Sequence, residues 1–211
     1  MGSPPPPPTC PTGLPAFQTD APAYVSPEEY LRLEREATEK HEYYNGEICA
    51  MAGASFAHNK LCMSLTIQLG SLLLGKSCSP LGSDQRVHVK NKSSFLYPDL
   101  SVVCGEPKFI ENKNPETLLN PTLLVEVLSA STGGNGRGEK FRLYRQIPSL
   151  RQYLLLDSQT LHAELYTLDE LGRWVLTETR DPAAVLDLGS VGAALPLAEL
   201  YRGVPLEAGV A

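Results

Sequence analysis

The sequence predicts an α/β (α+β) domain, a mixed β-sheet core flanked by helices. Two observations support this fold class. Segments with helical spacing alternate along the chain with short apolar runs of strand length. Their order is helix, hairpin, helix, three strands, helix, strand and hairpin, which is typical of one mixed sheet with helices packed against it. The chain has 211 residues and no internal repeat, and its length after a proline-rich start is enough for one sizeable domain with its own core.

The first 22 residues differ in composition from the remainder of the chain. They contain eight of the 18 prolines. Proline fixes φ and lacks an N–H, so this stretch cannot form a helix or a central strand. We therefore expect residues 1–22 to be a disordered, solvated arm and residues 23–211 to form the domain.

Three segments have the spacing and end signals of helices. Residues 27–36 follow Ser26 at the N-cap position and begin with Pro27, which is favoured at the first helical position. Residues 59–74 repeat apolar side chains at helical spacing and stop at a glycine. Residues 139–147 form the third helix, after a glycine-rich loop and before a proline. A last helical turn is expected over residues 195–201.

The remaining ordered segments have the length of strands. Residues 41–51 read as a hairpin that turns at Asn45-Gly46, the strongest two-residue hairpin signal. A second hairpin is expected from residues 161–168 and 173–178. Strands are also expected within four further runs: residues 79–90, 97–104, 122–128 and 152–156.

The charge and composition exclude several classes of protein. The net charge of −6 excludes a strongly basic protein that binds nucleic acid through its field alone, although it permits a local basic patch. No apolar run approaches the roughly 18 residues of a membrane helix. The N-terminus lacks the basic and apolar regions of a secretory signal.

The five cysteines contain no Cys-x-x-Cys pair, which argues against a zinc ribbon or a redox dithiol. Cys49, Cys62 and Cys104 lie among apolar residues and are expected to be small core side chains. We therefore expect a reducing, cytoplasmic location.

Two carboxylates interrupt apolar strands and are the first candidates for a functional site. Asp99 lies in Tyr-Pro-Asp-Leu-Ser-Val-Val, and Glu126 lies in Leu-Leu-Val-Glu-Val-Leu. An ionised carboxylate in such a strand costs several kcal/mol unless it is paired or binds a metal. Because the two strands are consecutive and could lie side by side, the two carboxylates predict a shared site. The alternative is a structural role, with each carboxylate satisfied by an arginine or a backbone N–H.

Lys140 is the third candidate. At about 100° per residue, it falls in the middle of the apolar arc formed by Leu143, Tyr144 and Ile147. Its side chain is therefore expected to point inward, where it could join the two carboxylates. The alternative is a side chain that runs along the apolar face and extends its charge to solvent.

Two carboxylates and a lysine suit metal-dependent phosphodiester hydrolysis. Carboxylate oxygens are ligands for Mg²⁺ or Mn²⁺, and a lysine can stabilise developing negative charge. Glu47, just after the Asn-Gly turn, is a possible third carboxylate or a solvent-facing residue of the hairpin. Asp84 is a weaker fourth candidate that could instead pair with Arg86. His58 is expected to cap the second helix rather than line the site.

These residues lie in segments that resemble the Uma-type family of the PD-(D/E)XK nuclease superfamily, formerly a domain of unknown function. The resemblance spans residues 26–203 with order and spacing intact. The matching segments are SPEEYLRLE, HEYYNGEICAMAGASFAHNKL, GSDQRV, YPDLSVVC, NPTLLVEVLSAST, RGEKFRLYRQIPSLRQYLLLD and LPLAELY.

The resemblance implies a restriction-endonuclease-like core and assigns positions in its motif. Asp99 takes the Asp position and Glu126 the Asp/Glu position, while Glu47 matches an acidic residue of the early Gly-Glu-Ile segment. The superfamily's motif lysine would fall at Leu128, and in this family it has moved to the next helix, where Lys140 matches it.

Two further differences from the family pattern concern the glycine-rich loop. This chain has Ser-Ala-Ser-Thr at residues 129–132, where the family commonly has Ser-Pro-Ser-Thr. It has Gly136 where the family commonly has Asp. These differences affect the rigidity of the loop and leave the carboxylates intact.

The sequence therefore predicts a Mg²⁺-dependent DNA endonuclease in which Asp99, Glu126 and Glu47 are metal ligands and Lys140 supports the reaction. The superfamily's habit of cutting both strands in pairs also implies a homodimer. Two alternatives remain open: a nucleic-acid-binding module that has lost turnover, and a partner-binding protein on the same fold.

Overall fold

The computed structural model describes residues 24–51, 53–89, 93–110, 116–129 and 136–207. Its main sheet has six strands in the order β11-β10-β9-β8-β6-β3. Strands β8 and β9 are parallel and the other neighbours are antiparallel, so this sheet is mixed, as predicted. Its strands are β3 (Cys78–Gly82), β6 (Leu100–Cys104), β8 (Leu123–Leu128), β9 (Gln152–Asp157), β10 (Ala163–Leu168) and β11 (Trp174–Thr179).

A second sheet of five strands, in the order β2-β1-β5-β4-β7, corrects the expectation of one sheet. Its strands are β1 (His41–Tyr44), β2 (Glu47–Ala50), β4 (Arg86–Val89), β5 (Ser94–Leu96) and β7 (Thr117–Leu118). The run predicted over residues 79–90 divides at a turn, and β3 and β4 then join different sheets. A short apolar run does not specify its pairing partner, so the assignment of its two halves to different sheets was not visible in the sequence.

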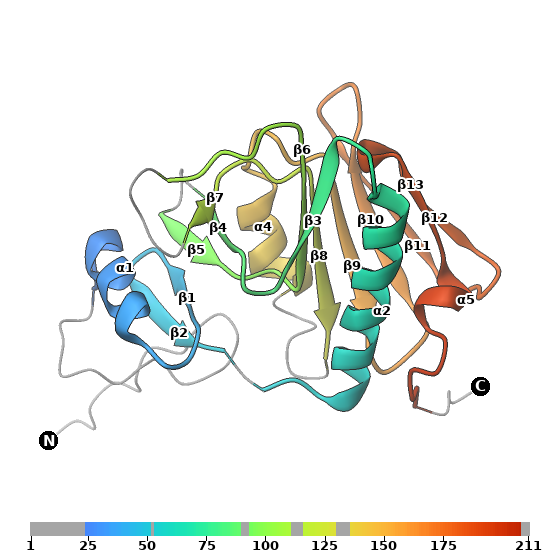
Figure 1. Cartoon of the computed structure of the whole chain (residues 1–211), viewed down its shortest axis with the longest axis horizontal. Helices are drawn as coiled ribbons and strands as arrows, with labels where there is room; N and C mark the ends of the chain where they lie inside the picture. Colours follow the sequence, from blue (N-terminus) through green and yellow to red (C-terminus); the bar gives the residue numbers. More distant parts are fainter. Residues whose placement is uncertain (1–23, 52, 90–92, 111–115, 130–135, 208–211) are drawn as a thin grey trace, which may run out of the picture.

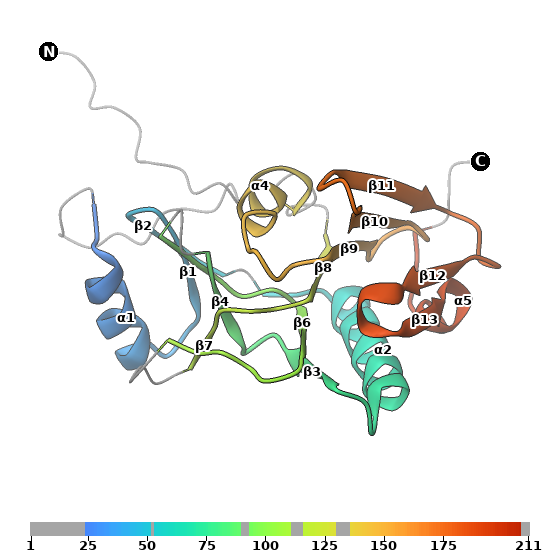
Figure 2. The same ribbon diagram turned by 90° about the horizontal axis from the view of Figure 1, so that it is seen from above.

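Helices cover both faces of the main sheet. Figure 2 shows α2 (Phe56–Leu73) and α4 (Phe141–Tyr144) on opposite sides. The side chains of β8 alternate accordingly: Val125 and Val127 join the core beneath α2, and Leu124 and Leu128 join the core beneath α4. The α2 side is completed by β12 (Val185–Leu188), the 3₁₀ turn η3 (Gly189–Val191), β13 (Ala193–Pro196) and α5 (Leu197–Leu200). The β12–β13 hairpin was not predicted.

The first helix and first hairpin form as the local signals predict (Figure 1). Helix α1 (Pro27–Glu36) begins after Ser26, whose Oγ accepts the Glu29 N–H at 3.2 Å. Strands β1 and β2 are joined at Asn45 and Gly46, both of which have positive φ. Such angles suit a tight hairpin turn and favour these residue types.

Two other predicted elements differ from the structure. Helix α2 begins at Phe56, with Ser55 as its N-cap, three residues earlier than expected. The third helix begins as a π-helical turn, η2 (Gly136–Lys140), and α4 then ends at Tyr144 rather than Ile147. The proline-rich arm and residues 130–135 of the glycine-rich loop lie outside the described residues.

The expectation that Cys49, Cys62 and Cys104 are small core side chains is wrong for Cys49 and Cys104, which form disulfides. Cys78 and Cys104 form a disulfide between β3 and β6, where the strand register sets them directly opposite each other. Cys49 is disulfide-bonded as well. Cys62 is a free, partly buried cysteine. Among the described residues, no helix is long and apolar enough to span a membrane.

Candidate metal centre

Asp99 and Glu126 meet where β6 begins and β8 ends. Leu100 pairs with Val125 in the antiparallel register, and continuing that register by one residue sets Asp99 opposite Glu126. The Val127 N–H donates to Asp99 Oδ2 at 2.7 Å, which fixes this carboxylate against the neighbouring strand. The expectation that the two strands lie side by side is therefore confirmed.

Lys140 points inward and contacts two carboxylates. Its Nζ lies 3.1 Å from each carboxylate oxygen of Glu126 and 2.9 Å from Glu42 Oε1. Leu143 and Tyr144, which share its predicted arc, are also buried. The side chain of Lys140 is only 10% exposed, so it does not extend its charge to solvent.

Glu42 is an acidic residue of this cluster that the sequence reasoning missed. It lies on β1 and is 3% exposed. Its Oε1 accepts the Tyr97 N–H at 3.0 Å as well as Lys140, and its Oε2 accepts the Tyr44 hydroxyl at 2.6 Å. The signal was available, because Glu42 is a carboxylate inside a strand of aromatic residues, just as Asp99 and Glu126 interrupt apolar strands.

The other two acidic candidates lie apart from Lys140. Glu47 pairs with Tyr44 beside the hairpin turn, so it shares a face with Glu42 but stands nearer the turn. In the described part of the chain, no hydrogen bond or ion pair joins Glu47 to Lys140. The side chain of Asp84 is 95% exposed and pairs with Lys40 at 2.9 Å. The expected pairing of Asp84 with Arg86 is therefore wrong.

Hydrogen bonds behind the cluster hold its parts in place. The Tyr144 hydroxyl donates to Glu126 Oε1 at 2.9 Å. The Tyr153 hydroxyl donates to the Gly136 carbonyl oxygen at 3.0 Å and anchors the π-helical turn that carries the lysine. A Cβ on Gly136 would lie 2.6 Å from Leu128 Cδ2. Gly136, which differs from the family pattern, and Leu128, which differs from the superfamily motif, are therefore packed close together.

The electrostatics of the cluster show a surplus of negative charge. Burial, Asp99 and Glu42 together raise the pKa of Glu126 to about 8, although Lys140 lowers it. Burial lowers the pKa of Lys140, but Glu126 and Glu42 raise it by more, so it lies well above its ordinary value. The single ammonium group of Lys140 thus pairs with two buried carboxylates, Glu126 and Glu42, and Asp99 lies close to Glu126. Carboxylate oxygens such as those of Asp99 and Glu126 are the donor type that a hard divalent cation prefers.

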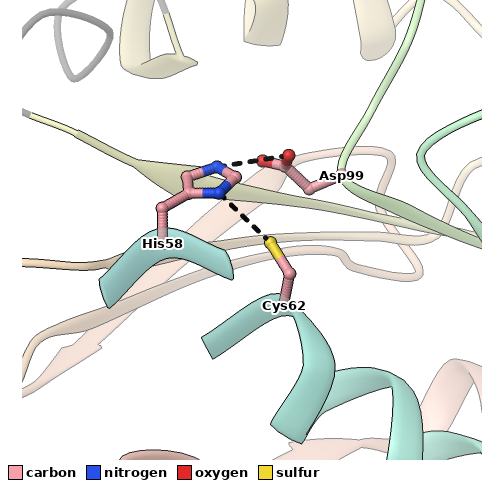
Figure 3. A group of neighbouring side chains, drawn as sticks. All are labelled: His58, Cys62 and Asp99. Atoms are coloured by element: carbon pink, nitrogen blue, oxygen red, sulfur yellow. Dashed lines mark hydrogen bonds and ion pairs between the residues drawn. The ribbon is translucent and has the colours of Figure 1, made fainter. Parts of the chain in front are cut away.

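His58 also contacts Asp99, which corrects its expected role as a helix cap. Ser55 caps α2 by accepting the His58 N–H, and the His58 ring lies toward the sheet (Figure 3). His58 Nε2 lies 3.3 Å from Asp99 Oδ1, and Nδ1 lies 3.6 Å from Cys62 Sγ. Burial lowers the pKa of His58, but Asp99 raises it by more.

Comparison with known proteins finds a matching family and two similar proteins. The family model "Uma2: Putative restriction endonuclease" matches residues 27–198. An uncharacterized protein of Synechocystis sp. (strain ATCC 27184 / PCC 6803 / Kazusa) is 37% identical over 180 residues, which cover 85% of this chain and 93% of the relative. A second uncharacterized protein of that strain is 40% identical over 150 residues, covering 71% and 84%.

A solved structure shares the fold. It is described as a crystal structure of "a putative nuclease belonging to DUF820" from Anabaena variabilis ATCC 29413. The TM-score is 0.68 at 15% identity, covering 84% of this chain and 97% of the other. The similarity therefore extends over nearly the whole described domain.

Proposed function

This chain belongs to the Uma2 family, and we propose that it is a metal-dependent endonuclease that hydrolyses phosphodiester bonds in DNA. The family description supports the reaction class. The observation that carries the proposal is the cluster where β6 begins and β8 ends: Glu126 and Glu42 both contact the ammonium of Lys140, and Asp99 lies beside Glu126.

In this proposal Asp99 and Glu126 hold Mg²⁺ or Mn²⁺. Glu42 is linked to this pair because Lys140 contacts both Glu42 and Glu126. The oxygens of Asp99 and Glu126 match the ligand preference of these ions, and the raised pKa of Glu126 indicates a carboxylate short of positive charge. A cation bound there would polarise the phosphate and lower the pKa of a coordinated water. Glu47, on the same face of the hairpin, stays a predicted further ligand.

Lys140 supports the reaction by charge. Its ammonium group is held between Glu126 and Glu42 and is placed to orient a water or to offset negative charge that develops on the phosphate. Tyr144 fixes Glu126, and the Val127 N–H fixes Asp99. These contacts preorganise the charged groups, so little rearrangement is needed when a phosphodiester arrives.

DNA is the proposed substrate, and its binding should depend on the cation. The net charge is −6, and the three carboxylates would repel a phosphate. A divalent cation would offset this repulsion where the phosphate must approach, so we expect weak DNA binding without metal. A homodimer is a further part of the proposal. The disulfides remove the observation on which the expected cytoplasmic location rested.

A plasmid assay tests the proposed function. Purified protein is incubated with supercoiled plasmid and Mg²⁺ or Mn²⁺, beside Asp99→Ala and the control Asp84→Asn, which changes an exposed carboxylate. We expect nicking by the wild type and the control but not by Asp99→Ala. Equal nicking by Asp99→Ala would contradict the site. Salt-sensitive DNA binding without nicking would indicate a silent binding module instead.

A further inference from the structure

A histidine, a cysteine and a carboxylate meet beside the proposed metal centre. His58 and Cys62 lie four residues apart on α2, so both project from the same side of the helix (Figure 3). Each of His58, Cys62 and Asp99 offers one ligand atom, and these three atoms lie within 4.8 Å of one another. All three side chains are partly buried.

The three ligand atoms lie close enough to reach one small tetrahedral ion after a side-chain rotation. Zinc bonds of about 2.0–2.1 Å to nitrogen or oxygen and about 2.3 Å to sulfur put neighbouring ligand atoms roughly 3.3–3.6 Å apart. The structure has 3.3 Å between His58 Nε2 and Asp99 Oδ1, and 3.6 Å between His58 Nδ1 and Cys62 Sγ. These two contacts use different ring nitrogens, so a shared ion requires a side-chain rotation that brings both partners to one nitrogen.

The donor types distinguish this cluster from the carboxylate cluster next to it. Thiolate sulfur and imidazole nitrogen favour Zn²⁺ and Co²⁺, whereas carboxylates alone favour Mg²⁺ and Mn²⁺. The same three residue types could also form a nucleophilic triad. Burial, however, raises the pKa of the Cys62 thiol well above its ordinary value, which opposes a free thiolate nucleophile.

We propose that His58, Cys62 and Asp99 form a second cation site that takes Zn²⁺ and competes with the catalytic cation for Asp99. Binding replaces the thiol S–H bond by a bond from sulfur to zinc and releases the proton to solvent. The three protein ligands leave a fourth position for water. Zn²⁺ would thus inhibit the enzyme by withdrawing Asp99, a consequence that rests on the proposed nuclease function. The site itself does not rest on it.

Cobalt absorption tests the site without using activity. Co²⁺ is added to the full chain with its disulfides intact, and the thiolate-to-cobalt charge-transfer band is recorded for the wild type, Cys62→Val and His58→Ala. We expect the band in the wild type, its loss in Cys62→Val, and its displacement by Zn²⁺. A wild type without the band, or a band that persists in Cys62→Val, would overturn the proposal.

A second arm separates this proposal from the proposed function. The ratio of plasmid nicking with and without Zn²⁺, at fixed Mg²⁺, is measured within each protein. We expect a large loss of rate in the wild type and a ratio near one in Cys62→Val. Equal inhibition of both proteins by Zn²⁺ would contradict the proposal that Zn²⁺ bound at Cys62 competes with the catalytic cation for Asp99. If the wild type shows the cobalt band but no nicking, the nuclease proposal fails while the cation site stands.

An independent observation concerns the opposite face of α2. The buried side of α2 packs on the main sheet. On the other side, the large apolar residues Phe56, Met63 and Ile67, with Leu74 at the C-cap, form an exposed stripe. Their spacing of seven, four and seven residues places them on one side of the helix. Lys60 is the one lysine, arginine or carboxylate within α2, so this face lacks the charges usual on a solvated helix.

The stripe is symmetric about the middle of the helix. If two copies of α2 pack antiparallel about that midpoint, Phe56 of one copy lies against Leu74 of the other, and Met63 lies against Ile67. A two-fold axis would therefore match this surface with itself, as an isologous dimer requires. We infer that a second copy of this chain covers the stripe through antiparallel α2 helices.

Light scattering after gel filtration tests this interface. We expect a dimer for the wild type and a monomer for Ile67→Glu. The control Leu171→Glu changes an equally apolar, exposed residue in the β10–β11 turn and should stay dimeric. A monomeric wild type, a dimeric Ile67→Glu or a monomeric Leu171→Glu would each contradict the inference.

Discussion

The raised pKa of Glu126 leads to a prediction for how the stability of Glu126→Gln depends on pH. The pKa of Glu126 rises from an ordinary 4.5 to about 8 because burial and two nearby carboxylates outweigh Lys140. Between these values the folded protein holds a proton that the unfolded chain has lost. Since the folded state binds more protons, the free energy of unfolding must fall as pH rises through this window.

The magnitude follows from the shift. One pKa unit corresponds to 1.36 kcal/mol, so between about pH 5.5 and about pH 8 the metal-free wild type should lose about 3 kcal/mol of stability through this group. Glutamine keeps the shape of the side chain but does not titrate. The stability of Glu126→Gln should therefore fall much less over the same range.

Urea unfolding in the presence of EDTA measures the effect. The difference in unfolding free energy between wild type and Glu126→Gln is compared at the two pH values, because the titration of groups distant from Glu126 is common to both proteins and cancels in the difference. Glu170→Gln, in an exposed turn, serves as the control and should follow the wild type. Parallel curves for wild type and Glu126→Gln, or a wild type that gains stability relative to the variant as pH rises, would refute the reasoning.

Three further predictions concern the supports of the site. Tyr144→Phe removes a buried hydroxyl donor and should lower the unfolding free energy by about 1–2 kcal/mol, measured by urea unfolding; an unchanged midpoint would contradict the bond. Gly136→Ala forces a Cβ against Leu128 and should cost about 1–3 kcal/mol and reduce plasmid nicking, whereas full activity would show that the turn adapts. Cys78→Ala with Cys104→Ala opens a cross-link over 26 residues and should cost roughly 3–4 kcal/mol; thermal unfolding unchanged from wild type would argue against the disulfide.

Local signals in the sequence account for most of the elements. Ser26 and Pro27 specify the start of α1, and the Asn-Gly pair specifies the first hairpin, because capping and turn geometry depend on a few adjacent residues. The assignment of strands to two sheets was missed because pairing depends on contacts distant in sequence. The β12–β13 hairpin was missed because it carries no turn signal as strong as Asn-Gly.

The residues of the candidate site that could be predicted are those whose charge falls at a position the sequence pattern expects to be buried. Asp99 and Glu126 stand out because a carboxylate in an apolar strand needs a partner, and Lys140 stands out because it shares an arc with core residues. The same test applied to β1 would have found Glu42, whereas Glu47 was chosen from its place in a motif. The contact between His58 and Asp99 could not be foreseen, since it depends on how α2 packs across the end of β6.

The binding of Mn²⁺ measured by titration calorimetry tests the central claim most directly, because it needs no substrate. The account predicts that the wild type binds at least one Mn²⁺ with measurable heat. Asp99→Asn and Glu126→Gln should bind it much more weakly, and Asp84→Asn should match the wild type. A wild type that shows no heat, or an Asp99→Asn isotherm identical to that of the wild type, would contradict the assignment of these carboxylates as the metal site.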